Sequence, residues 1–260
     1  MIKHIQIQVL PEQAEDLKSI KKISAKYLEI NQSEITHIEI LKKSIDARKK
    51  IIKINLSIEI FINEKFIKKN ENLPILRNVE NKETVLIVGA GPAGIFAALK
   101  LIENGKKPII IERGKDVKNR RKDLANINKN HIVNRDSNYC FGEGGAGTYS
   151  DGKLYTRSKK RGDVEKILDI FIMHGANPDI KIESQPHIGT NKLPTIIRNI
   201  RETIIECGGE FLFNSKVTDI IIKNSCVDGV VLKNGSTINS QKVILATGHS
   251  ARDIFELLNY

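Results

Sequence analysis

Residues 85–94 read Val85-Leu86-Ile87-Val88-Gly89-Ala90-Gly91-Pro92-Ala93-Gly94, an apolar run that meets a Gly-x-Gly-x-x-Gly turn. Gly89 permits the tight turn, Gly91 lets a ligand approach the backbone, and Gly94 allows a helix to pack closely on a strand. Pro92 suits the first turn of that helix, because its missing N–H would have no intrahelical partner there. The stretch predicts a strand, a turn and a helix whose N-terminus, Ala93 included, binds a pyrophosphate. We call residues 89–94 the fingerprint turn.

A second apolar run, Pro108-Ile109-Ile110-Ile111, ends at Glu112, which lies 23 residues after Gly89 (112 minus 89). In dinucleotide-binding β-α-β units, an acidic residue about 20 residues beyond the glycines accepts hydrogen bonds from a ribose. We therefore expect Glu112 to bind the hydroxyls of an adenosine ribose. The alternative is a tightly turned β-α unit that binds no ligand.

The residues after this unit predict further elements of the same domain. We expect a helix capped by Asp163, another from Pro194 to the Gly208-Gly209 pair, and a three-strand meander over about 217–238. The last strand, 243–246, is apolar throughout, which predicts that it is buried on both faces.

The first 62 residues predict a separate, small α+β domain. Ile5, Ile7 and Val9 alternate with polar residues, as in a half-buried strand, and apolar positions between 11 and 30 follow helical spacing. Two further strands are expected at about 36–41 and 52–60. The sequence thus predicts a β-α-β-β domain at 1–62, a linker at 63–83 and a second domain at 84–260.

Composition favours an ordinary globular protein without a membrane segment, with 40% hydrophobic and 28% charged residues. The net charge of +11 is spread along the chain: residues 1–82 hold 16 basic and 11 acidic side chains, and the rest hold 26 and 20. This spread argues against nucleic-acid binding. The cysteines at 140, 207 and 226 lack a metal-ligand spacing, so we expect no metal site and a reducing cytoplasm.

An interrupted Rossmann unit, followed by a meander and an apolar strand ending in Ala-Thr-Gly at 246–248, resembles the FAD/NAD(P)-binding oxidoreductase superfamily that includes glutathione-reductase-like enzymes. The resemblance implies an α/β fold, with a Rossmann-like FAD-binding domain that has a parallel sheet and a β-meander. It implies that Glu112 and Arg113 bind adenosine, that Val217 holds adenine through its backbone, and that Thr247 and Gly248 pass near the nucleotide. FAD is favoured, and NAD(P) is the alternative.

A glycine-dense stretch reads Gly142-Glu143-Gly144-Gly145-Ala146-Gly147-Thr148-Tyr149-Ser150-Asp151-Gly152-Lys153-Leu154. Its glycines let a backbone approach a flat ligand, with N–H donors for flavin oxygens. We call residues 142–148 the glycine loop and expect five of them at the cofactor: Gly144, Gly145, Ala146, Gly147 and Thr148. A flexible loop without a ligand is the alternative. With the segments 44–48, 186–190 and 246–253, the stretch resembles a largely uncharacterised bacterial family of FAD-dependent dehydrogenases along essentially the whole chain.

The sequence assigns no catalytic residue. His187 and His249 adjoin the predicted site and could exchange protons near neutral pH, and a structural role is the alternative for each. Lys153 could stabilise negative charge at the flavin or be solvated. Cys140 has no partner cysteine at a redox spacing.

We expect an FAD-dependent oxidoreductase that acts on a small-molecule substrate or takes electrons from a donor such as NAD(P)H. Members of the resembled family continue well beyond the position of Tyr260, through a late Gly-Asp segment that holds the flavin. The expectation is therefore an N-terminal half without its C-terminal half, which binds flavin weakly and does not turn over. The alternatives are a non-catalytic or truncated nucleotide-binding module and a flavoprotein associated with RNA. The N-terminal domain has no aromatic motif for stacking bases.

Overall fold

The computed structural model describes residues 1–67, 73–154, 156 and 162–259. The chain forms two compact units. Unit 1 contains residues 1–72, 153–172 and 176–188, and unit 2 contains residues 73–152, 173–175 and 189–260. Residues 68–72 of the expected linker lie outside the described residues, and the boundaries drawn from the sequence stay a prediction. In the described part of the chain, no helix is both long and apolar enough to cross a bilayer.

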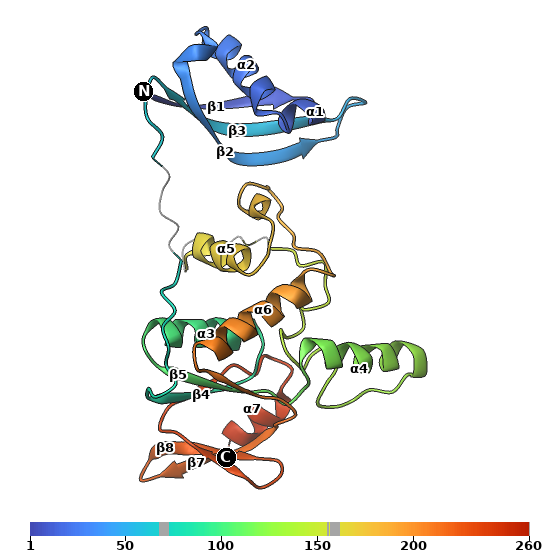
Figure 1. Ribbon diagram of the computed structural model, residues 1–260. Coiled ribbons are helices and arrows are strands. Elements are labelled where there is room, and N and C mark those ends of the chain that lie inside the picture. Colours follow the sequence, from blue (N-terminus) through green and yellow to red (C-terminus); the bar gives the residue numbers. More distant parts are fainter. Residues whose placement is uncertain (68–72, 155, 157–161, 260) are drawn as a thin grey trace. The chain divides into compact units, whose positions relative to one another are not determined.

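Unit 1 is built on an antiparallel sheet in the order β1-β3-β2, with a helix across one face (Figure 1). The strands are β1 (Ile2–Val9), β2 (Ile35–Asp46) and β3 (Lys53–Ile62). Alternate residues of β3 from Ile54 to Ile60 are buried in one cluster with Ile20 of the helix. The period-two pattern of the sequence thus places one face of the sheet in the core.

The expected single helix between residues 11 and 30 is divided into α1 (Pro11–Ala14) and α2 (Leu17–Leu28). Asp16 is the cause, because its carboxylate accepts the N–H groups of Lys18 and Ser19 and so caps a new helix start. A short 3₁₀ turn, η1 (Gln32–Glu34), leads into β2.

Unit 1 also holds η2 (Pro178–Lys181) and all but the last residue of α5 (Val164–Met173). Asp163 accepts the N–H of Lys166 at 3.0 Å, which confirms the predicted cap of α5. The chain after η2 extends the sheet by a short parallel bridge, in which Ser184 donates its N–H to the carbonyl of Lys43 at 3.0 Å.

Unit 2 has the predicted α/β architecture. A parallel sheet runs in the order β10-β4-β5-β6, and α3 and α6 cover one face of it (Figure 1). Val217, Val230 and Leu232 of the meander pack against the other face, on Leu86, Val88 and Ile111. The sheet strands are β4 (Thr84–Val88), β5 (Lys107–Ile111), β6 (Glu210–Leu212) and β10 (Val243–Leu245). The meander strands are β7 (Val217–Lys223), β8 (Cys226–Leu232) and β9 (Thr237–Asn239). The helices are α3 (Pro92–Glu103), α4 (Val117–Asn130), α6 (Leu193–Glu206) and α7 (Arg252–Leu258).

Two features of unit 2 differ from the expectation. The helix α4 was not expected, because its composition is polar and it buries only Val117, Arg120 and Leu124. The expectation that 243–246 is buried on both faces was wrong, since Leu245 is 38% exposed. Among the described strands β10 pairs only with β4, so its other edge has no strand to cover it.

Candidate functional site

The fingerprint turn joins β4 to α3 and has the geometry that its glycines require. Gly89 has a φ of +109°, and a Cβ there would lie 2.4 Å from the carbonyl oxygen of Ala246. A Cβ on Gly94 would lie 1.9 Å from the carbonyl oxygen of Gly89, so only glycine allows this close packing. At Gly91 the nearest atom to a Cβ would be 3.9 Å away, which leaves room beside the backbone.

The N-terminus of α3 offers free hydrogen-bond donors beside Gly91. Gly91 is the N-cap and Pro92 the first helical residue, so no side chain caps the helix. Within the described chain, no protein group accepts the N–H of Ala93 or Gly94. Unsatisfied N–H groups and the positive end of the helix dipole both favour a negative charge at this position.

Glu112 lies beneath the turn, is 5% exposed and accepts three backbone N–H groups. Its Oε2 accepts from Ala90 at 2.8 Å, and its Oε1 accepts from Gly114 at 2.8 Å and from Gly142 at 3.1 Å. A carboxylate has about four acceptor positions, so Oε2 keeps one for a further donor. The expected ribose contact of Glu112 stays a prediction.

A pocket opens beside the turn, and we call it the turn pocket. Its walls are Val88, Gly89, Ile111, Arg113, Ser215, Val217, Thr247 and Ile254. Four of these residues, Gly89, Arg113, Val217 and Thr247, were expected at the cofactor from four separate segments. Gly248 follows the pocket wall but is exposed, and a Cβ on it would meet no atom within 4 Å.

Arg113 is held in the wall of the turn pocket by a carboxylate and a ring. Its Nη2 donates to both oxygens of Asp253, at 3.0 and 2.7 Å, and its guanidinium carbon lies 4.5 Å from the ring centroid of Phe141. Lys216 Nζ lies 2.9 Å from the same carboxylate of Asp253. Burial opposes ionisation of Asp253, but the hydrogen bonds from Arg113 and Lys216 outweigh it and lower the pKa of this carboxyl.

The glycine loop packs on the fingerprint turn through its first half. Gly144 donates its N–H to the carbonyl of Ala90 at 2.8 Å, and a Cβ on Gly145 would lie 3.1 Å from Cδ of Pro92. Ala146 and Gly147 are exposed. Thr148 is buried, with its hydroxyl 3.0 Å from the carbonyl oxygen of Glu143, so it closes the loop on itself.

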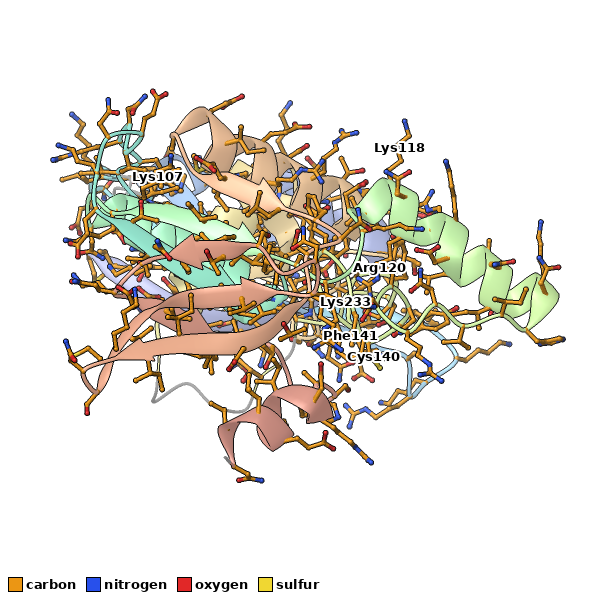
Figure 2. The ribbon with its side chains drawn as sticks, turned by 90° about the horizontal axis from the view of Figure 1, so that it is seen from below. Lys107, Lys118, Arg120, Cys140, Phe141 and Lys233 are labelled. Atoms are coloured by element: carbon orange, nitrogen blue, oxygen red, sulfur yellow. The ribbon has the colours of Figure 1, made fainter. Side chains whose placement is uncertain are left out.

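A buried arginine on α4 holds the segment that leads into the glycine loop. Arg120 is fully buried and donates to the carbonyls of Asn138 at 2.9 Å, Tyr139 at 3.0 Å and Glu143 at 2.7 Å. Figure 2 shows Arg120 near the start of α4, with Phe141 and Cys140 close to it. A Cβ on Gly142 would lie 2.4 Å from Cδ of Arg120, so this glycine makes room for the arginine rather than for a ligand.

Glu143 is the second buried charge behind the loop. Its Oε2 accepts the N–H of Val117 and Nη1 of Arg201, both at 2.7 Å, and its Oε1 has no partner among the described residues. Burial raises the pKa of Glu143, although Val117 and Arg201 act in the opposite direction. The roles of Arg120, Glu143 and Arg201 could not be predicted from the sequence, because a charged residue in a polar segment gives no pattern that reveals burial.

The other candidates are not among the residues that line the turn pocket. His187 is exposed and pairs through its backbone with Lys153, where Leu154 donates its N–H to the carbonyl of Pro186 at 2.9 Å. His249 is exposed, and Cys140 is an exposed free thiol. None of them lines the turn pocket.

The sequence of the chain matches two family models. Residues 83–257 match the family described as pyridine nucleotide-disulphide oxidoreductase, and residues 1–61 match a domain of unknown function (DUF8436). The chain is 41% identical over 259 residues to an uncharacterised protein of Clostridium beijerinckii, covering 94% of this chain and 48% of that protein. It is 26% identical over 186 residues to the thiamine thiazole synthase of Aeropyrum pernix, covering 65% of this chain and 56% of that protein.

Among solved structures, the crystal structure of THI4 from Thermovibrio ammonificans matches with 19% identity and a TM-score of 0.45. That match covers 68% of this chain and 61% of the other. The chain spans about half the length of the curated relatives it matches.

Proposed function

Because the chain belongs to the pyridine nucleotide-disulphide oxidoreductase family, we propose that it is an FAD-dependent oxidoreductase whose unit 2 binds the ADP half of FAD at the fingerprint turn. One observation carries the proposal. Gly89, Arg113, Val217 and Thr247 come from four separate segments and line a single pocket beside a helix N-terminus. Such a pocket at the end of parallel strands is the usual nucleotide site of a Rossmann-type sheet.

The described residues fit each part of the ADP group. The free N–H groups of Ala93 and Gly94, with the space beside Gly91, suit the pyrophosphate. The remaining acceptor position of Glu112 Oε2 suits a ribose hydroxyl, and the backbone of Val217 suits adenine.

In this proposal the glycine loop approaches the flavin end of the cofactor. Its contacts with Ala90 and Pro92 keep the loop beside the pyrophosphate position. FAD, when bound, supplies the ability to accept a hydride or electrons, and the protein positions it.

The substrate is a small molecule, and NAD(P)H is the proposed electron donor. The free thiols of Cys140, Cys207 and Cys226 suit the reducing cytoplasm, which we propose as the compartment.

A binding titration tests the cofactor. The purified chain is titrated separately with FAD and with FMN by equilibrium dialysis, which also measures weak binding. FMN lacks the AMP part that the turn pocket is proposed to hold, so FAD is expected to bind at least roughly tenfold tighter. Equal affinity for FMN, or no measurable binding of either flavin at equilibrium, would contradict the proposal.

Anaerobic addition of NADH or NADPH then separates an enzyme from a binding module. Bleaching of the bound flavin is the result expected for an oxidoreductase. A stable oxidised flavin spectrum would favour a non-catalytic nucleotide-binding module.

A further inference from the structure

Two cationic side chains, one of which lines the turn pocket, share one carboxylate. Arg113 lines the pocket, and Lys216 lies between the pocket residues Ser215 and Val217 in the chain. Asp253 accepts hydrogen bonds from Arg113 at 2.7 and 3.0 Å and lies 2.9 Å from Nζ of Lys216. The side chains of Arg113 and Lys216 are 13% and 26% exposed, so solvent screens this cluster only in part.

The adenosine ribose distinguishes two chemical classes of dinucleotide. An acidic residue after the second strand binds a free 2′-hydroxyl, whereas an arginine nearby accommodates a 2′-phosphate. This chain carries both types side by side, as Glu112 and Arg113. Which class the pocket accepts therefore depends on whether the arginine is free to bind a phosphate.

We propose that Asp253 is a specificity-determining residue: by engaging Arg113 and Lys216 it makes the turn pocket accept an adenosine with a free 2′-hydroxyl and reject a 2′-phosphorylated one. This inference rests on the proposed nucleotide site. It deepens that proposal by naming the class of adenosine ligand and the residue that selects it.

The charges at the site support this role. Arg113 and Lys216 carry two formal positive charges, and Glu112 and Asp253 carry two negative ones, so the cluster sums to zero. A 2′-phosphate would add negative charge beside Glu112 and would have to displace Asp253 from Arg113 to gain a charge-assisted hydrogen bond.

The position of Asp253 is fixed from more than one direction. It lies in the first turn of α7, where the helix dipole favours a carboxylate, and the next residue, Ile254, is buried and lines the turn pocket. The partner of Asp253 is held as well, because the guanidinium of Arg113 lies over the ring of Phe141, 4.5 Å from its centroid. The carboxylate and the guanidinium are thus held together before any ligand binds.

Calorimetric titration with ADP and with 2′-phospho-ADP tests the inference on the full chain. Wild type is expected to bind ADP more tightly. Asp253→Asn, which keeps the size of the side chain and removes its charge, is expected to shift the affinity ratio by roughly tenfold toward 2′-phospho-ADP, the value of one charge-assisted hydrogen bond. The control Asp228→Asn removes the ion pair with Lys223 in the meander and is expected to leave the ratio unchanged.

A wild type that prefers 2′-phospho-ADP, or an Asp253→Asn variant with an unchanged ratio, overturns the inference. If Asp253→Asn does not fold, Lys216→Met is measured instead. Asp253 then pairs with Arg113 alone, so the preference for ADP over 2′-phospho-ADP should rise. An unchanged or smaller preference for ADP contradicts the role of Asp253. Failure of wild type to bind either ligand would instead overturn the proposed nucleotide site.

Discussion

Gly142 donates its backbone N–H to Oε1 of Glu112 at 3.1 Å, which joins the acid at the end of β5 to a glycine 30 residues later. The same carboxylate also accepts the N–H groups of Ala90 and Gly114. Glu112 therefore holds the fingerprint turn, the chain after β5 and the glycine loop together. Its structural role exists before any nucleotide binds.

Replacement of Glu112 by glutamine is expected to destabilise the protein by about 2–3 kcal/mol. Glutamine has one acceptor oxygen, and its NH₂ group would face a backbone N–H, so at least one buried donor loses its partner. Chemical denaturation measures the free energy of unfolding. The control Glu202→Gln alters an exposed pair with Arg198 and should change stability by less than about 0.5 kcal/mol. Equal effects of the two variants would contradict this role for Glu112.

Gly142→Ala and Gly147→Ala test why the loop contains glycine. Gly142 has a φ of +118° and would place its Cβ 2.4 Å from Arg120, so alanine should cost about 2–4 kcal/mol of stability. Gly147 lies outside the left-handed region and has no atom within 4 Å of a Cβ, so alanine there should change stability by less than about 0.5 kcal/mol. Thermal unfolding of both variants gives the comparison, and a tolerated Gly142→Ala would show that Arg120 does not constrain the loop.

Glu143 is expected to make stability depend on pH. Burial raises the pKa of this carboxyl above its ordinary 4.5, so the folded protein binds the proton more tightly than the unfolded chain does. The resulting stabilisation is complete below the ordinary pKa and is lost as the pH rises through the raised value. Glu143→Gln remains neutral throughout. Between pH 4.5 and neutrality, the free energy of unfolding should therefore fall more for wild type than for Glu143→Gln, as measured by chemical denaturation at a series of pH values. The same pH dependence in both proteins would argue against the raised pKa.

The sequence predicted the elements whose patterns are local. The apolar runs and the glycines at 89–94 predicted β4, the turn and α3, and strict alternation predicted β3. The polar helix α4 has no such pattern, since its stability depends on Asp116 as a cap and on the burial of a few side chains.

The supporting side chains of the site were not predictable, because their partners are distant in sequence. Arg113 and Asp253 are 140 positions apart, and Glu143 and Arg201 are 58 apart. Nothing in either local segment specifies these pairs. Only the folded structure shows that Asp253 pairs with Arg113 in the wall of the turn pocket and that Arg201 pairs with Glu143 behind the glycine loop.

Gly91→Asp is expected to separate nucleotide binding from folding. Gly91 is the N-cap of α3 and has space for a side chain, and aspartate is a preferred N-cap residue, so stability should be unchanged or slightly higher. The new carboxylate would occupy the position proposed for the pyrophosphate and would repel the negative charge of that group. Lys192→Asp, at the N-cap of α6, adds a carboxylate away from the turn pocket and serves as the control.

Calorimetric titration of FAD into wild type, Gly91→Asp and Lys192→Asp tests the central claim most directly. The account predicts that Gly91→Asp binds at least roughly tenfold more weakly, by loss of charge-assisted contacts, while Lys192→Asp binds like wild type. Equal FAD affinity in Gly91→Asp and wild type would show that the fingerprint turn does not hold the cofactor.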